Sequence, residues 1–293
     1  MNAVSARPRR SALYMPASNA RAIEKARGLA CDMVILDLED AVLPQMKPSA
    51  RESATAAVQA GGFGRREVVM RVNALETPWG AEDLAAAASA GPDAVLVPKI
   101  RGRGDIADCE AALAEAPSHT RLWAMIETPQ AILNIAGIAS AGGRLAGLTL
   151  GVNDLAKETG ARQTRGREAF HAALSLSVMA ARANGLVVLD GVHNEIDDLE
   201  ALAEVCRQGA DFGFDGKSLI HPSHIDICNA AFSPPPAEVA WARAVIAAFA
   251  DPQNTGKGAL RVEGRLAERL HCEQAERLVA IAESIADAEY AGA

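Results

Sequence analysis

The sequence predicts a (β/α)₈ barrel followed by a helical appendage. Three observations support this fold class: eight short apolar segments, a longer alanine-rich amphipathic stretch after each of them, and a length of 293 residues. Short apolar runs that alternate with helical periods are typical of parallel strands buried on both faces. An open doubly wound sheet is the alternative, but the turn at residues 16–19 lacks the glycines of a phosphate-binding loop.

The eight predicted strands are the apolar segments at residues 11–16, 33–38, 68–72, 94–97, 122–126, 145–151, 186–189 and 210–214. The eight predicted helices are the amphipathic stretches at residues 20–29, 49–60, 80–90, 106–114, 129–139, 166–184, 196–208 and 223–231. This count and the chain length both match a barrel, which commonly takes about 250 residues.

A break in the pattern follows the eighth unit, where Ser233 is followed by three prolines. Beyond it the sequence predicts a helix at residues 237–250, a loop rich in Gly, Asn and Pro at 251–258, and a charged amphipathic helix from about 266 to 290. We therefore expect a barrel domain at residues 1–232 and a helical segment at 233–293 that acts as a lid or in oligomerisation.

The composition narrows the partners and the compartment. The chain has 29 basic and 37 acidic residues and a formal net charge of −8, which argues against nucleic acid or an anionic membrane as partner. No apolar run is long enough for a membrane span, and the N-terminus lacks the apolar core of a secretory signal. The five scattered cysteines indicate neither a disulfide framework nor a zinc site. We expect a reduced, cytoplasmic protein.

Polar side chains follow almost every predicted strand, and in a parallel barrel these strand ends meet at one rim. The residues at these strand ends are Pro16 and the polar residues Ser18, Asp37, Glu39, Asp40, Arg71, Asn73, Lys99, Glu127, Asn153, Asp154, Asp190, His193, Asp215, Lys217 and His221. Any one of them would be unremarkable in a loop. Their convergence on one face predicts a functional site there.

Two carboxylates at this rim indicate a metal. Glu127 and Asp154 end consecutive strands, and adjacent carboxylates without a thiolate suit a hard cation such as Mg²⁺. The alternative is that they are helix N-caps or solvated loop acids. His221 and His224 could form a second metal pair, but they more plausibly line the start of the last helix.

Arg71 ends the third strand, where a guanidinium is well shaped to hold a substrate carboxylate through two hydrogen bonds. A structural ion pair with Asp37 or Glu39 is the other role, and both roles can coexist. The acidic residues Asp37, Glu39 and Asp40 are expected to contact Arg71 and metal-bound water, and so to orient them without binding the metal directly.

Several motifs, taken together and in order, resemble the citrate lyase β-subunit-like family of the HpcH/HpaI aldolase superfamily, which includes malyl-CoA and citramalyl-CoA lyases. The motifs are residues 10–16 (RSALYMP), 36–42 (LDLEDAV), Lys47, Ala50 and Arg51, 71–73 (RVN), 126–128 (IET), 151–155 (GVNDL) and 213–222 (GFDGKSLIHP). The resemblance implies a barrel that binds Mg²⁺ and a small 2-oxo acid, and that makes or breaks a carbon–carbon bond beside an acyl-CoA thioester.

The resemblance also implies roles for individual residues. Glu127 and Asp154 match the metal ligands, with Glu127 also facing the substrate, and Arg71 matches the arginine that binds the substrate carboxylate. The positions that match contacts to the CoA moiety are Tyr14, Lys25, Arg21 (where lysine is usual), Ile220 and His221.

A C-terminal departure from the family concerns the acid/base. Several CoA lyases carry a Gly-x-Met-Ile-Asp motif whose aspartate enters a neighbouring subunit's site, whereas this chain reads GRLAE at residues 264–268, so Glu268 stands in its place. A helical stripe is expected to dock on another subunit; it comprises Leu266, Leu270, Ala275, Leu278 and Ile281. The resemblance implies a homo-oligomer, a trimer or a multiple of it.

The leading hypothesis is a Mg²⁺-dependent lyase that cleaves a carboxylated 3-hydroxy-acyl-CoA into a 2-oxo acid and an acyl-CoA, with Arg71 and Glu268 as catalytic residues. Two alternatives stay open: a thioesterase that hydrolyses a malyl-CoA-like compound at the same metal site, and a non-catalytic protein that binds an oxo acid. Membership of a larger complex also stays open.

Overall fold

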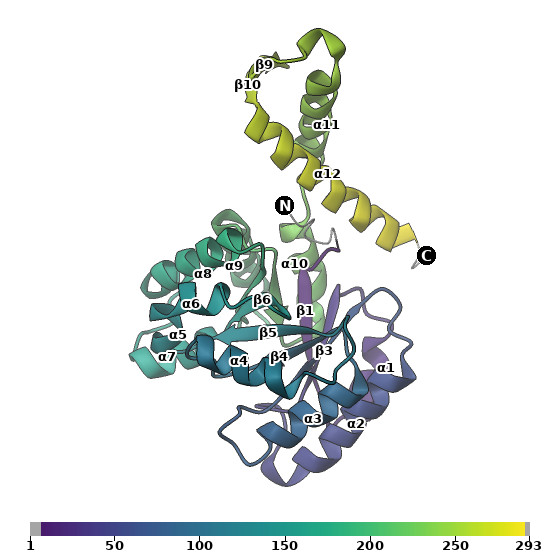
Figure 1. Ribbon diagram of the computed structural model, residues 1–293, viewed down its shortest axis with the longest axis vertical. Coiled ribbons are helices and arrows are strands. Elements are labelled where there is room, and N and C mark those ends of the chain that lie inside the picture. Colours follow the sequence, from purple (N-terminus) through teal and green to yellow (C-terminus); the bar gives the residue numbers. More distant parts are fainter. Residues whose placement is uncertain (1–6, 291–293) are drawn as a thin grey trace. The chain divides into compact units, whose positions relative to one another are not determined.

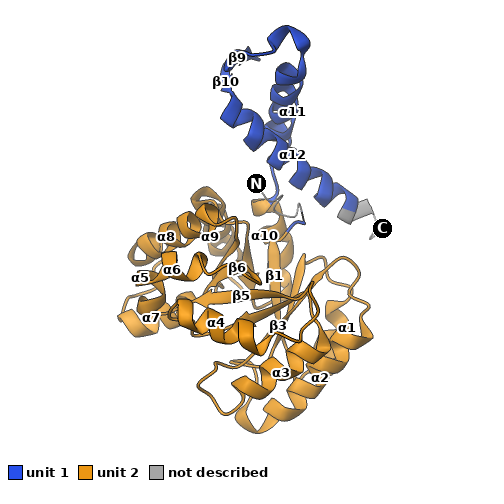
Figure 2. Ribbon diagram, viewed as in Figure 1, with its two compact units in different colours: residues 1–8, 233–293 blue, residues 9–232 orange. Residues whose placement is uncertain are grey.

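The computed structural model describes residues 7–290. It divides the chain into two compact units, one formed by residues 9–232 and a C-terminal unit that begins at Ser233 (Figure 2). Each unit is described by itself below.

The barrel unit, residues 9–232 (orange in Figure 2), is a closed barrel of eight parallel strands, in which each strand pairs with the next along the chain and the last pairs with the first (Figure 1). This confirms the predicted fold class. The strands are β1 (Ser11–Pro16), β2 (Met33–Asp37), β3 (Glu67–Arg71), β4 (Ala94–Val97), β5 (Arg121–Ile126), β6 (Leu145–Leu150), β7 (Val187–Asp190) and β8 (Gly216–Leu219).

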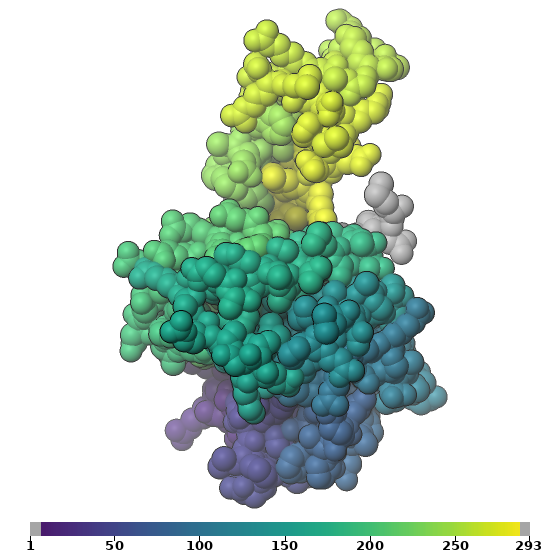
Figure 3. All heavy atoms as spheres, turned by 90° about the vertical axis from the view of Figure 1, so that its left-hand side faces the viewer, coloured from purple at the N-terminus to yellow at the C-terminus, as the bar shows by residue number. Residues whose placement is uncertain are grey.

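Helices surround the barrel, and those from the middle of the chain form the face of this unit that Figure 3 shows. They are α1 (Ala20–Ala26), α2 (Lys47–Ala60), α3 (Gly80–Ala90), α4 (Arg103–Ala112), α5 (Pro129–Leu133), α6 (Ile135–Ala139), α7 (Val152–Thr159), α8 (His171–Ala183), α9 (Leu199–Phe212) and α10 (Ile225–Phe232). Short 3₁₀ turns precede α2, α8 and α10; they are Pro44–Met46, Glu168–Phe170 and Pro222–His224.

The eighth strand was predicted at the wrong place. Residues 210–214 form the last turn of α9 and the residues after it, where Phe212 and Phe214 pack against the core. The helix is capped by Gly213 in the left-handed conformation (φ 94°). The strand itself follows at Gly216–Leu219, and its polar Lys217 is fully buried because Asp190 and the Gly191 carbonyl accept its hydrogen bonds. The predicted helix at 129–139 is likewise divided at Asn134 into α5 and α6.

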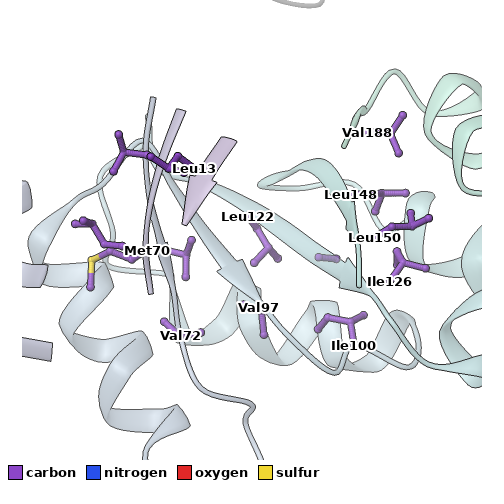
Figure 4. Close-up of a cluster of buried hydrophobic side chains, with 14 of the residues drawn as sticks. Leu13, Met70, Val72, Val97, Ile100, Leu122, Ile126, Leu148, Leu150 and Val188 are labelled. Atoms are coloured by element: carbon purple, nitrogen blue, oxygen red, sulfur yellow. The ribbon is translucent and has the colours of Figure 1, made fainter. Parts of the chain in front are cut away.

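The core of the barrel unit has two layers. One fills the interior of the barrel around Met33, Trp123 and Leu189. The other lies between the strands and the helices and includes Leu13 and Val188 (Figure 4). Gly147 shows how closely the interior is packed, because a Cβ atom there would come within 2.5 Å of the Trp123 ring.

The C-terminal unit contains α11 (Pro236–Ala250), a 3₁₀ turn (Pro252–Asn254), a two-stranded antiparallel hairpin of β9 (Ala259–Val262) and β10 (Arg265–Glu268), and α12 (Arg269–Tyr290). The predicted final helix therefore starts too early, since residues 266–268 belong to a strand. Within the described part of the chain, no helix combines the length and apolarity that a membrane crossing requires.

The predicted docking stripe is only partly available to a partner. Ala275 and Leu278 pack against α11 in the core of the C-terminal unit. Leu266 and Leu270 remain exposed, at 65% and 51%. Ile281 is half-buried. The exposed part of the predicted oligomer contact is therefore formed by these two leucines.

Candidate active site

The first part of the candidate site is a buried arginine held by a carboxylate from the neighbouring strand. Arg71 ends β3 and lies opposite Asp37, which ends β2. Its Nε and Nη2 atoms each donate to one oxygen of Asp37 at 2.7 Å, while Nη1 lies 2.8 Å from Glu39 and 3.3 Å from Asp40. Bidentate pairing of this kind fixes the plane of the guanidinium. The remaining nitrogen, Nη1, is the one that is free to meet a ligand in exchange for Glu39 or Asp40.

Burial and charge set the protonation of this group. Burial opposes the charged form of Arg71, but Asp37 and its neighbours raise the arginine pKa well above its ordinary value. Burial raises the pKa of Glu39 to about 8, with Arg71 opposing and Asp40 and Glu127 adding to the rise. Glu39 can therefore take up and release a proton near neutral pH.

Tyr14 lies inside the barrel beside this group rather than on its outer surface. The Arg71 guanidinium lies 4.6 Å from the centre of the Tyr14 ring, within range of a cation–π contact. Burial raises the tyrosine pKa, so the phenol stays neutral. From this position Tyr14 would meet the acid end of a substrate.

The second part of the site is a pair of carboxylates that share one lysine. Glu127 follows β5 and is 1% exposed, and Asp154 lies in the first turn of α7. The Lys99 Nζ atom lies 2.7 Å from Asp154 Oδ1 and 3.3 Å from Glu127 Oε1. The Lys99 backbone N–H also donates to Glu127 Oε1 at 2.7 Å. The two acids thus converge on a single positive charge.

The local backbone is adapted to this arrangement. Lys99 has a left-handed conformation with φ 56°, which L-residues seldom adopt outside constrained sites. Gly151, which precedes α7, leaves room for Glu127, because a Cβ atom at residue 151 would lie 2.5 Å from Glu127 Oε2. Burial raises the pKa of Glu127, although Lys99 opposes the rise. Burial alone would lower the pKa of Lys99, but its bond to Asp154 and the charge of Glu127 raise it.

A buried lysine holds the backbone of the acidic loop at residues 37–40. Lys47 Nζ donates to the carbonyls of Leu38 and Glu39 at 2.9 and 3.0 Å and to Asn73 Oδ1 at 2.6 Å. Asn73 is itself held by Asp83. These bonds fix the backbone that carries Glu39 into the site.

The remaining predicted residues lie on elements other than those that carry these carboxylates. Arg21 and Lys25 are exposed and lie one turn apart on α1. Ile220 is partly exposed after β8, and His221 caps the following 3₁₀ turn by accepting from the Ser223 amide. Glu268 ends β10 in the C-terminal unit, where its amide donates to His271 Nδ1.

His221 and His224 lie at the start of the last helix, the place that the sequence favoured over a metal pair. His224 is fully buried and its Nε2 atom is bonded to the Ile196 carbonyl, while His221 faces Ser223. Sequence reasoning assigned no role to Lys99 or Lys47. Their signal was weak: Lys99 was one more polar residue at a strand end, and Lys47 was one letter in a motif.

The carboxylate pair fits a divalent cation that takes only one or two ligands from the protein. Residues 7–290 contain no cluster of three or more His, Cys, Asp or Glu side chains that could enclose a metal. Mg²⁺ does not require one, since it commonly uses one or two carboxylates and keeps several waters. The ammonium of Lys99 already occupies the position of positive charge between Glu127 and Asp154. The Lys99 side chain is 23% exposed, so it is not enclosed by the two acids.

The family of the chain follows from comparison with known proteins. The model of the HpcH/HpaI aldolase/citrate lyase family matches residues 10–222, a span that contains every residue of the two site parts. The chain belongs to this family. The predicted resemblance is confirmed.

Relatives within this family extend over nearly the whole chain. A (3S)-malyl-CoA thioesterase of Cereibacter sphaeroides (strain KD131 / KCTC 12085) is 47% identical over 281 residues, covering 96% of this chain and 97% of the relative. The citrate lyase subunit beta of Escherichia coli (strain K12) is 32% identical over 285 residues, covering 94% of each chain.

Among solved structures, the CitE protein of Mycobacterium tuberculosis in complex with magnesium, acetoacetate and coenzyme A is 32% identical. It matches with a TM-score of 0.77 and covers 96% of this chain and 99% of its own. A family member of this fold thus holds magnesium and coenzyme A together, which supports the predicted cofactor.

Proposed function

We propose that the protein hydrolyses the CoA thioester of a small hydroxy acid that carries a carboxylate, of the malyl-CoA type. The observation that carries this proposal is the 47% identity to a (3S)-malyl-CoA thioesterase over nearly the full length of both chains, against 32% for a citrate lyase β-subunit. The sequence favoured the lyase and kept hydrolysis as an alternative. The higher identity to the thioesterase supports placing hydrolysis first.

Glu127 and Asp154 would hold Mg²⁺, with Lys99 turning outward. When bound, the cation would supply a positive charge that polarises the substrate oxygens and stabilises negative charge on them. Arg71 would bind the substrate carboxylate through Nη1, since Asp37 engages its other two nitrogens. Tyr14, stacked on Arg71, would form one wall of this subsite.

Hydrolysis needs a base to take a proton from water, and Glu39 is the group we assign to it. Its carboxylate lies 2.8 Å from Arg71 Nη1, next to the proposed carboxylate subsite, and its pKa is raised to about 8. A base whose pKa lies near the working pH combines availability with proton affinity. The thiolate of CoA leaves readily, so no strong acid is required for its departure.

The CoA moiety is proposed to contact the exposed cations Arg21 and Lys25 of α1, and Ile220 and His221 after β8. The exposed Leu266 and Leu270 support a homo-oligomer, and a trimer or its multiples stays the expected form.

A carbon–carbon lyase is the second candidate, favoured by the citrate lyase relatives. In that reaction the acyl-CoA fragment leaves as an enolate that must be protonated. Glu268 from a neighbouring chain would be the donor, with Arg71 and the metal ligands in the same roles.

Product analysis separates the two reactions. Malyl-CoA is incubated with the enzyme and Mg²⁺, and the products are resolved by chromatography. Hydrolysis yields malate and free CoA, whereas cleavage yields glyoxylate and acetyl-CoA. We expect malate and CoA, and we expect Asp154→Ala to lower the rate by about 10²–10³, as for loss of a charge-stabilising group. Equal activity in EDTA would exclude the metal, and glyoxylate as the main product would replace hydrolysis with the lyase.

A further inference from the structure

A separate cavity lies in the barrel unit between the loop before α8 and the segment that leads into α9. Its volume is about 230 Å³, and none of the residues of the two site parts lines it. Its apolar lining includes Val152, Phe170 and Val205, and its polar lining includes Arg167 and His193. The cavity is thus large enough for a molecule of several carbon atoms, with an apolar and a polar side.

Arg167 is one of the residues that line this cavity, and its side chain has a donor without a partner among the described residues. Its side chain is 9% exposed, its Nη1 atom donates to both oxygens of Asp190 at 2.8 Å, and its Nε atom donates to Gln208 at 2.7 Å. The third nitrogen, Nη2, is covered from solvent and has no hydrogen-bond partner in the part of the chain that the structure describes. A buried guanidinium nitrogen without an acceptor is costly, and native proteins rarely retain one without a reason.

The charge around Arg167 favours an anion. Asp190 is shared between Arg167 and Lys217, whose Nζ atom lies 2.9 Å from it, and Asp190 and Lys217 are fully buried. Arg167 and Lys217 therefore share a single carboxylate, which leaves one positive charge without a paired negative charge in this group. The acids that also line the cavity are engaged or solvated: Asp198 caps α9 through the Ala201 amide, and Glu195 is 69% exposed.

His193 also lines the cavity, and one of its ring nitrogens is a second atom without a partner among the described residues. The side chain is 9% exposed, and its Nδ1 atom lies 3.6 Å from Glu195. Its Nε2 atom is buried and, over residues 7–290, has no hydrogen-bond partner. A neutral imidazole nitrogen either donates or accepts, depending on the tautomer, and a hydroxyl group can satisfy it in both cases.

We propose that this cavity binds a short 2-hydroxy carboxylic acid. Its carboxylate would pair with Arg167 Nη2, its hydroxyl would bond to His193 Nε2, and its carbon chain would lie against Val152, Phe170 and Val205. Such a ligand supplies both missing hydrogen bonds and the missing negative charge. The proposal is independent of the reaction assigned to the carboxylate pair.

Calorimetric titration of the full-length protein in EDTA tests this assignment, with 2-hydroxybutyrate and butyrate as matched probes. One added hydrogen bond predicts that 2-hydroxybutyrate binds about fivefold more tightly than butyrate. Shortening the chain to lactate should weaken binding by up to about fourfold, because one methylene leaves the apolar wall. Inorganic phosphate binding better than either acid would overturn the ligand class, and no saturable binding of 2-hydroxybutyrate would overturn the site.

Variants locate the binding. His193→Leu should abolish the preference for the hydroxy acid yet retain butyrate, and Ala201→Phe should fill the cavity and weaken both probes by at least about tenfold. Ala203→Phe, on the same helix but outside the cavity lining, is the matched control. Asp154→Ala should bind both probes as the wild type does. Loss of binding in Asp154→Ala, or unchanged binding in Ala201→Phe, would place the ligand elsewhere. Thermal melting without ligand verifies that each variant is folded. If Ala201→Phe does not fold, the binding measurements on His193→Leu decide the outcome.

Discussion

Two buried arginines of the barrel unit differ in how their charge is satisfied. Arg71 has Asp37, Glu39 and Asp40 around it, and the nearby Glu127 and Asp154 share Lys99. Arg167 has one carboxylate, which it shares with Lys217, and one nitrogen without a partner among the described residues. A ligand that binds Arg71 must replace one of its existing carboxylate partners. A ligand that binds Arg167 would instead supply a hydrogen bond that the protein does not provide.

This difference explains why the site around Arg71 suits catalysis. Groups that already balance one another hold their geometry before the substrate arrives, and their pKa values are set by their neighbours. Arg167 instead keeps one nitrogen without a partner among the described residues, which suits the binding of a ligand.

The largest effect is expected from removing a partner in the paired site. Asp37→Ala leaves Arg71 buried without its bidentate carboxylate, and loss of one member of a buried ion pair costs about 3–5 kcal/mol. Denaturant unfolding should show a loss of this order in the free energy of unfolding. A loss below about 1 kcal/mol, the range of exposed pairs, would mean that Glu39 and Asp40 replace Asp37.

Glu39→Gln addresses the proposed base. We expect turnover to fall by about 10²–10⁴, the usual contribution of a general base. The pKa of Glu39 is raised to about 8 in the metal-free protein, and a bound divalent cation lowers it by adding positive charge. Wild-type turnover should therefore rise with pH to an inflection below 8, where Glu39 loses its proton. The pH–rate profile of Glu39→Gln should lack the rise. A variant that keeps it assigns the base elsewhere.

Gly151→Ala tests the crowding around Glu127. The backbone conformation of residue 151 (φ −108°) is open to alanine, but its Cβ atom would displace the Glu127 carboxylate. Misplacement of a reacting group by about 1 Å can cost about 10²-fold in rate. Gly137→Ala in α6, where a Cβ atom meets nothing within 4 Å, is the matched control. Equal activity of both variants would show that Glu127 has room to move.

The smallest effect is expected in the unpaired cavity. His193→Leu removes a buried nitrogen that has no partner within residues 7–290, so the free energy of unfolding without ligand should change by less than about 1 kcal/mol or increase. A loss as large as that of Asp37→Ala would show that His193 is already satisfied, and the contrast between the two places would disappear.

The fold class could be predicted from the sequence because buried strands appear there as short apolar runs, as at β1, β2 and β4. It misplaced β8 because that strand is polar, and Lys217 can be buried only where tertiary structure supplies Asp190. The rim residues Arg71, Glu127 and Asp154 were predictable from their place at strand ends. The bridging Lys99, the raised pKa of Glu39 and the unpartnered Arg167 nitrogen arise from contacts between distant segments, and no local pattern encodes them.

The central claim is that water attacks the thioester carbonyl, and isotope labelling tests it most directly. Malyl-CoA is turned over with Mg²⁺ in H₂¹⁸O, and the released malate is analysed by mass spectrometry. Hydrolysis predicts one ¹⁸O atom in the carboxylate that was the thioester, in step with the release of free CoA. Release of acetyl-CoA with glyoxylate, and no labelled malate, would contradict the proposed thioesterase and establish carbon–carbon cleavage in its place.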